Sequence, residues 1–271
     1  MTDTAHLPTA ALEGYLRNAL LPSHRQQVRT HLDACKACWT AWNRHRWDAA
    51  STDPLYSQLA EFLGADFQPY FDSSQALARE WATANPRTEH ETAQFFRTST
   101  SYLYNLTIWQ ASGNRPAYVP LALPTLIRRG SRTILDYGCG IGNDSIPLRQ
   151  SGFDVVGCDF HSPSTAFLRW RSDGTIPVIE PNELDTLAAP DTLWIIDTLD
   201  HVVDIDTSLR TVLAVVDLVV TENLTANRGH GRQGFHIRRP FTELTALFAR
   251  FGLRPNSTSK NDPVMFWTRV R

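Results

Sequence analysis

The segment Ile134-Leu-Asp-Tyr-Gly-Cys-Gly-Ile-Gly-Asn-Asp144 reads as a buried strand that runs into a loop with three glycines. Glycine suits such a loop because it adopts positive φ angles without strain and lets a bulky ligand touch bare backbone. A dinucleotide-binding loop would read Gly-x-Gly-x-x-Gly. Here the third glycine comes one residue early, and Asp136 precedes the first glycine. The segment therefore predicts a ligand-binding loop of another kind.

Around this loop, from Ser131 to Arg271, short β-branched runs alternate with helical patterns. The expected strands are 133–137, 154–159, 176–179, 192–197, 217–223, 253–258 and 264–270. The expected helices are 145–150, 164–171, 207–214 and 241–251. Such alternation predicts an α/β fold, a doubly wound parallel sheet covered on both faces. Because only residues 259–263 separate the last two strands, these must form a hairpin, which makes one edge antiparallel.

Acidic residues and glycines gather where the expected strands end. In a doubly wound sheet, ligands bind beyond the C-terminal ends of the strands, where the strand order reverses. The glycine loop follows the first strand, Asp159 ends the second, and Asp197 ends the fourth. Asp200 follows three residues later, and His201 comes directly after it. We therefore expect the ligand at this edge.

The acidic residue followed by Gly-x-Gly-x-Gly resembles the first motif of class I methyltransferases that use S-adenosylmethionine (SAM). The resemblance covers about residues 131–271 and implies a seven-stranded Rossmann-like sheet with an antiparallel last strand. It also implies that Asp159 binds both ribose hydroxyls, that Phe160 packs near the adenine, and that the rim around Asp200 and His201 lies beside the transferred methyl group. The cofactor-binding residues implied in this part of the chain are Asp136, Gly138, Cys139, Gly140, Gly142, Asp159, Phe160, Asp197 and Thr198.

Methyl transfer from SAM is an in-line displacement at an activated sulfonium, so the enzyme mainly positions and desolvates the reactants. A general base is needed only if the acceptor must lose a proton, and His201, Asp197, His230 and His236 are the candidates. We retain His201 and His236, with Tyr104, as catalytic residues. Residues 225–237 are predicted to form a substrate-specificity loop, with an exposed polar loop as the alternative.

An aromatic stretch, residues 95–109, precedes the first strand of the sheet. In enzymes of the resembled family, a helix in this place often folds over the cofactor, and a tyrosine there binds the methionine carboxylate or the substrate. Tyr102, Tyr104 and Asn105 are the candidates, and Tyr102 is assigned to the cofactor. The alternative is that these aromatic side chains form a helical core.

A cysteine-histidine cluster lies near the N-terminus, with the spacing His31-x3-Cys35-x2-Cys38. On one helix these residues would form a single stripe suited to tetrahedral zinc. The segment resembles the zinc-finger module of bacterial anti-sigma factors over residues 5–45. That resemblance implies a fourth ligand at His6, with His24 or His45 as replacements, and a structural zinc. A redox pair is the alternative, and the module could dock a protein partner.

The bulk composition narrows the class of protein. The 271 residues carry a net charge of −2, with 42% hydrophobic and 20% charged residues. A packed core is expected, and neither nucleic acid nor an anionic membrane is an expected partner. The N-terminal residues lack the basic start and apolar run of a secretory signal. Cys139 and Cys158 are expected to pack as apolar side chains, and the cysteine usage indicates a reduced, cytoplasmic protein.

These patterns predict three regions: a zinc module at 1–47, a helical lid region at 48–130, and a SAM-binding domain at 131–271. The leading hypothesis is an enzyme that methylates a small-molecule substrate. The second is an enzyme of the same fold that cyclises SAM or transfers its aminocarboxypropyl arm, releasing methylthioadenosine. The third is a SAM-sensing regulator that binds a protein through the zinc module.

Overall fold

The computed structural model describes residues 6–224, 236–237, 239–256 and 262–270. The described chain forms two compact units. The first contains the residues up to Ala82 together with Thr100–Pro116, and the second contains Thr83–Ser99 and most of the chain from Ala117 onward. None of the described helices has the length and apolar character that a membrane span requires.

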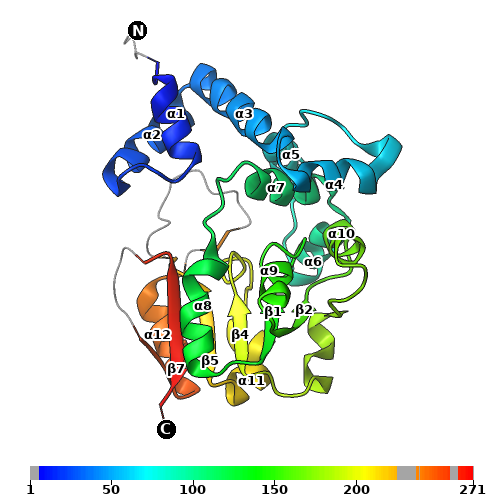
Figure 1. Cartoon of the computed structure of the whole chain (residues 1–271), viewed down its shortest axis with the longest axis vertical. Coiled ribbons are helices and arrows are strands. Elements are labelled where there is room, and N and C mark those ends of the chain that lie inside the picture. The colour runs from blue at the N-terminus through cyan, green and yellow to red at the C-terminus, as the bar shows by residue number, and fades with distance from the viewer. Residues whose placement is uncertain (1–5, 225–235, 238, 257–261, 271) are drawn as a thin grey trace. The chain divides into compact units, whose positions relative to one another are not determined.

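The second unit is built on a seven-stranded sheet with the order β3-β2-β1-β4-β5-β7-β6 (Figure 1). Its strands are β1 (Thr133–Tyr137), β2 (Asp154–Cys158), β3 (Val178–Ile179), β4 (Thr192–Ile195), β5 (Leu218–Glu222), β6 (Leu253–Pro255) and β7 (Val264–Arg269). Strands β1 to β5 are parallel, whereas β7 is antiparallel to both β5 and β6. The predicted fold class, including the C-terminal hairpin, is confirmed.

Helices cover both faces of this sheet. They are α8 (Tyr118–Arg129), α9 (Ser145–Gln150), α10 (Pro163–Arg171), η2 (Pro181–Thr186), α11 (Ile205–Val215) and α12 (Phe241–Arg250). Leu193 and Ile195 on β4 pack in the core between the sheet and helices α11 and α12. Trp194 packs in the core on the other face, between the sheet and helices α8 and α9. Both faces of β4 are buried because parallel strands in this fold are covered on both sides.

The first unit is helical. It contains α1 (Thr9–Leu16), α2 (Pro22–Ala34), α3 (Lys36–Ser51), α4 (Pro54–Leu63), η1 (Gly64–Asp66), α5 (Ser73–Ala84) and α7 (Thr100–Ala111). The last two residues of α5 belong to the second unit. Cys35 separates α2 from α3 in an extended conformation, with φ −116° and ψ 101°. The predicted single helical stripe of ligands is therefore wrong, because the helix is interrupted at Cys35.

The aromatic stretch 95–109, expected to be helical, is divided between two helices, α6 (Glu89–Thr98) and α7. Ser99 lies between them with ψ 111°, and the Thr98 hydroxyl donates to the Gln94 carbonyl at 3.1 Å. Serine and threonine side chains that bond to nearby backbone compete with helix continuation. The break assigns α6 to the sheet unit and α7 to the helical unit. The three-region division at residues 47 and 130 stays a prediction, since the middle region contributes to both units.

Candidate functional site

All three glycines of the loop after β1 have positive φ angles, and two of them have no room for a side chain. Gly138, Gly140 and Gly142 have φ angles of +80°, +49° and +79°, which other residues rarely adopt. A Cβ on Gly138 would lie 2.1 Å from the Thr198 Oγ1 atom, and one on Gly142 would lie 2.3 Å from the Leu168 Cδ1 atom. The loop is therefore pressed against the β4 loop on one side and α10 on the other.

Two buried carboxylates hold this loop from below. Asp136 accepts a hydrogen bond from the Ser145 hydroxyl at the start of α9. Asp144 accepts one from the Trp194 indole at 3.0 Å. Both bonds link the loop to the sheet and to α9, and a buried carboxylate with a bonded partner costs far less than an isolated one. Asp136 was predicted to contact the cofactor, and in the structure it accepts a hydrogen bond from Ser145, the first residue of α9.

Asp159 lies where β2 ends, as predicted. Its carboxylate accepts the backbone N–H of Gly140 at 2.9 Å and that of Phe160 at 2.7 Å. Burial raises the pKa of Asp159 to about 6, against the lowering effect of these two N–H groups. A carboxylate offers about four acceptor positions, so two remain for a vicinal diol. These remaining acceptor positions therefore fit the two ribose hydroxyls of SAM.

Helix α6 contacts residues at this edge of the sheet through Arg97, which the sequence interpretation did not name among the site residues. The Arg97 guanidinium forms a two-pronged ion pair with Glu180, which follows β3, and lies over the Phe160 ring at 4.7 Å. The pair lowers the pKa of Glu180 to about 2, chiefly because Arg97 donates to it. Arg97 and Glu180 are 83 residues apart, and no sequence signal joins them.

The loop after β4 begins with a strained residue. Asp197 has a φ of +56°, which is rare for a residue with a side chain. The Tyr118 hydroxyl donates to the Asp197 Oδ1 atom at 3.3 Å, and the His201 N–H donates to the Thr198 carbonyl at 2.8 Å. The second bond closes a tight turn from Thr198 to His201, and the first ties Asp197 to α8. Tyr118 was not among the predicted site residues.

Two of the predicted catalytic residues lie together beyond this turn. The rings of His201 and His236 are 4.7 Å apart, and the Phe96 ring meets His201 edge-on at 5.7 Å. The His201 Nε2 atom is 3.6 Å from the Oδ1 atom of buried Asp200. Sequence patterns could indicate His201 beside Asp200, but only the fold joins them to His236 and Phe96.

The predicted specificity loop, 225–237, lies outside the described residues except for His236 and Ile237, and so does His230. Tyr104 is buried in the first unit, where its hydroxyl accepts the Gln68 N–H at 2.6 Å. Asn105 accepts a hydrogen bond from the Ser74 hydroxyl at 3.1 Å. Both residues contribute to the packing of the helical unit, as the alternative reading of this stretch expected. The roles of Tyr102, Tyr104 and Asn105 toward a ligand stay predictions.

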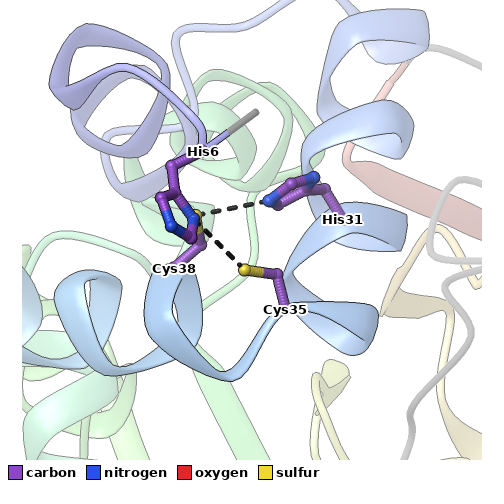
Figure 2. A group of neighbouring side chains, drawn as sticks. All are labelled: His6, His31, Cys35 and Cys38. Carbon is purple, nitrogen blue, oxygen red and sulfur yellow. Dashed lines mark hydrogen bonds between the residues drawn. The ribbon is translucent and has the colours of Figure 1, made fainter. Parts of the chain in front are cut away.

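Four side chains converge in the N-terminal cluster, as Figure 2 shows. They are the predicted ligands His6, His31, Cys35 and Cys38, whose ligand atoms all lie within 4.8 Å of one another. The His6 Nδ1 atom is 3.5 Å from each sulfur, and the His31 Nε2 atom is 3.3 Å from the Cys38 Sγ atom. Ligands around tetrahedral zinc are about 3.3–3.8 Å apart, given bond lengths of about 2.0–2.3 Å. The four residues therefore fit zinc.

The pKa values of the two thiols in this cluster shift in opposite directions. The pKa of Cys35 is lowered to about 6, first because the Cys38 backbone N–H donates to its sulfur and then because His6 and other neighbours do. Burial raises the pKa of Cys38, and a bound metal would replace its proton. A thiolate is the form that binds metal. The break at Cys35 allows both sulfurs to face the two imidazoles.

Comparison with known families identifies the larger part of the chain. Residues 112–255, more than half of the sequence, match the family model described as "Methyltransferase domain". The chain belongs to this methyltransferase family. Residues 9–38 match the model described as "Putative zinc-finger". The chain is thus a SAM-dependent methyltransferase with a zinc-finger module, and SAM and zinc are the cofactors that its residues fit.

Solved structures show similarity to the methyltransferase at low identity. Magnesium protoporphyrin IX methyltransferase from Synechocystis, with bound S-adenosylhomocysteine (SAH), is 15% identical, with 74% of this chain and 97% of that chain covered and a TM-score of 0.45. A sugar N-methyltransferase from Streptoalloteichus is 15% identical over 62% and 93% of the two chains, with a TM-score of 0.49. A TehB-like methyltransferase from Corynebacterium glutamicum is 17% identical over 62% and 96%, with a TM-score of 0.47. No curated protein matches the chain.

Proposed function

We propose that this methyltransferase acts on a small-molecule acceptor at the C-terminal edge of its sheet. The observation that carries the proposal is the position of α6. Arg97 on this helix contacts Glu180 and Phe160 beside Asp159, and Phe96 contacts His201 one residue earlier. One helix therefore covers both the side proposed for the adenosine and the side proposed for the acceptor. A covered edge suits a compact acceptor better than a polymer.

Asp159 is the proposed ribose-binding residue, with Gly138, Gly140, Gly142 and Phe160 around it. Its carboxylate is already oriented by two backbone N–H groups. Two acceptor positions remain, so that it can take one hydrogen bond from each hydroxyl of a vicinal diol. Asp136, at the end of β1, and Cys139, within the loop, are both buried and are proposed to support the loop. Thr198 lies against Gly138, and Asp197 precedes it in the chain; the methionine part of the cofactor is proposed to lie beside these two residues.

His201 and His236 are the proposed catalytic residues. Bound SAM supplies an activated methyl group on a positive sulfonium. The residues of this chain hold the acceptor in line with that carbon, exclude water, and manage the acceptor's proton. In the transfer, the bond from acceptor to carbon forms as the carbon–sulfur bond breaks, which leaves SAH. We propose that the His201 imidazole accepts this proton; the bond from the His201 N–H to the Thr198 carbonyl supports the proposal by fixing the backbone at His201.

Product analysis tests the proposal directly. The protein is incubated with SAM and a mixture of small-molecule acceptors, and the adenosyl product is identified by mass spectrometry. We expect SAH, whereas methylthioadenosine would show that the SAM is cyclised or gives up its aminocarboxypropyl arm. Failure to form either product with any acceptor, together with methylation of proteins or nucleic acid in a cell extract, would overturn the small-molecule assignment.

Binding of SAH tests the role of Asp159. The Asp159→Ala change removes the charged acceptor of two hydroxyl hydrogen bonds, each worth about 1.5–3 kcal/mol. We expect the dissociation constant, measured by isothermal titration calorimetry, to rise by about a hundredfold or more. The control is Asp154→Ala, at the exposed start of the same strand. Equal affinities for the two variants would remove Asp159 from the site. A protein partner for the zinc module and a cytoplasmic location stay predictions from the sequence.

A further inference from the structure

A second cluster of metal-binding side chains lies in the sheet unit. Asp200, His201 and His236 each offer one ligand atom, and these atoms all lie within 4.8 Å of one another. We propose that this cluster, distinct from the zinc module, binds a divalent first-row transition cation. The proposal stands on this geometry and does not depend on which acceptor the enzyme methylates.

The donor set is that of a metal site with open positions. Two imidazoles and one carboxylate on one side of an ion leave the other positions for water or a ligand, an arrangement suited to divalent iron and its neighbours in the first row. The N-terminal module instead offers two thiols and two imidazoles, which suit a closed structural zinc site. The two clusters therefore differ in chemistry and should differ in the metal they retain.

The backbone is built to hold these three side chains together. The Ile237 N–H donates to the Asp200 carbonyl at 2.6 Å, which joins the residue after His236 to the middle of the Asp200-His201 pair. Arg239 donates to the carbonyls of Val202 and Val203, the latter at 2.7 Å. Three hydrogen bonds between segments about 36 residues apart thus fix His236 against the turn. A site whose ligands are held by such bonds is preorganised for an ion.

The surroundings of the cluster favour a positive ion. The Asp200 side chain is 5% exposed, and the His201 side chain is 17% exposed. A carboxylate removed from water is stabilised by a cation at short range, since its own hydration is reduced. Arg239, three residues after His236, donates to the Val202 and Val203 carbonyls and to Glu243 at 2.8 Å. Phe96 closes one side of His201 with an apolar ring.

A bound cation would change the role of the two histidines. As ligands, their ring nitrogens would hold the ion and would not accept a proton from the acceptor. The ion itself would lower the pKa of a bound water or hydroxyl. The two roles exclude each other at the same nitrogen, so a direct metal-binding measurement decides between them.

Cobalt titration of the full chain tests the site without any need for turnover. The protein is purified with its N-terminal site filled by zinc, confirmed as one zinc per chain, and then titrated with Co²⁺ in the absence of SAM. We expect one Co²⁺ to bind in addition to the zinc. This Co²⁺ should show ligand-field absorption but not the thiolate-to-cobalt charge-transfer band that a cysteine site would give. Absence of a second equivalent would overturn the proposal.

Matched variants assign the bound ion to the three residues. His236→Ala and Asp200→Asn should each weaken binding of the second Co²⁺ by tenfold or more, while zinc content stays at one per chain. His90→Ala, at an exposed position of α6, is the control and should bind as the wild type does. Thermal melts check that each variant is folded. If Asp200→Asn does not fold, His201→Gln replaces it. Binding that is equal in all variants would contradict the assignment, because the ion would then lie elsewhere.

Because SAM is absent from the titration, failure of the metal site and failure of the methyltransferase proposal are distinguishable. If no Co²⁺ binds in addition to the zinc, the expectation that the enzyme forms SAH is unaffected. In that case His201 and His236 keep the proton-accepting role. Conversely, a second equivalent in a protein that forms no SAH would leave the metal site standing.

Discussion

The two pairs of cysteines in this chain lie in opposite environments. Cys35 and Cys38 face two imidazoles at the start of the helical unit, and the pKa of Cys35 falls to about 6. Cys139 and Cys158 are buried in the sheet unit, where burial and the nearby carboxylates of Asp159 and Asp136 raise the pKa of both thiols. The first pair can become thiolates and bind metal, while the second pair packs as small apolar side chains. Because Cys38 is as buried as the second pair, the two neighbouring imidazoles, rather than burial or residue type, decide which pair can bind metal.

The largest expected effect comes from removing the metal-binding pair. The core of the N-terminal module is small, comprising Leu12, Tyr15, Val28, Leu32, Cys38 and Trp42. Small units of this kind depend on their metal, whose apparent binding contributes about 10–16 kcal/mol in zinc-finger peptides. Cys35→Ser with Cys38→Ser should abolish zinc binding and unfold α1 and α2, as measured by metal analysis and by loss of amide-exchange protection.

The buried pair supplies the control for this prediction. Cys139→Ala and Cys158→Ala should each leave zinc at one per chain, because neither thiol belongs to the cluster. If the doubly substituted module kept its exchange protection without zinc, the cluster would be dispensable and the contrast between the two pairs would fail.

A smaller effect is expected from the glycine loop of the sheet unit. In Gly142→Ala the new methyl group would lie 2.3 Å from the buried Leu168 side chain, at a φ of +79°. Gly174→Ala is the matched control, since its φ is +68° but nothing lies within 4 Å. Both variants carry the cost of a positive φ, and Gly142→Ala should lose a further 1–3 kcal/mol, on the order of an overpacked core. Urea unfolding measures both, and equal losses would mean that the loop has room to move.

The smallest effect concerns the ion pair of Arg97 and Glu180. The pKa of Glu180 is lowered from 4.5 to about 2 by Arg97, so the folded protein holds the charged form more strongly than the unfolded chain does. The contribution to stability is present above pH 4.5 and is lost as the pH falls toward about 2. Both side chains are partly exposed, so the pair should contribute only about 1 kcal/mol.

Arg97→Gln should therefore be less stable than the wild type at pH 7, and the two should converge as the pH approaches 2. The free energy of unfolding at several pH values measures this. Arg149→Gln, which breaks the more exposed pair with Asp154, is the control and should change stability little. A difference between Arg97→Gln and the wild type that does not vary with pH would show that packing against Phe160, rather than the ion pair, holds α6.

Local patterns predicted much of this molecule. Strand β1 and helix α9 begin and end at the expected residues. Their bounds are predictable because an apolar run, the glycines and a helical pattern follow one another within about a dozen residues. The four zinc ligands were predicted from spacing and resemblance, although the helix through them is broken at Cys35. Spacing along an assumed helix could not show that break.

The sequence by itself determined the α/β order, the glycine loop and the four residues of the N-terminal cluster, because each depends on residues that are close in the chain or on a regular alternation. Only the tertiary structure brought Arg97 to Glu180, His236 to His201, and Asp144 to Trp194. These pairs join segments tens of residues apart, and their contacts depend on the strand order of the sheet and on where α6 ends. Partners of that kind leave no periodic trace in the sequence, since nothing local requires either residue to be there.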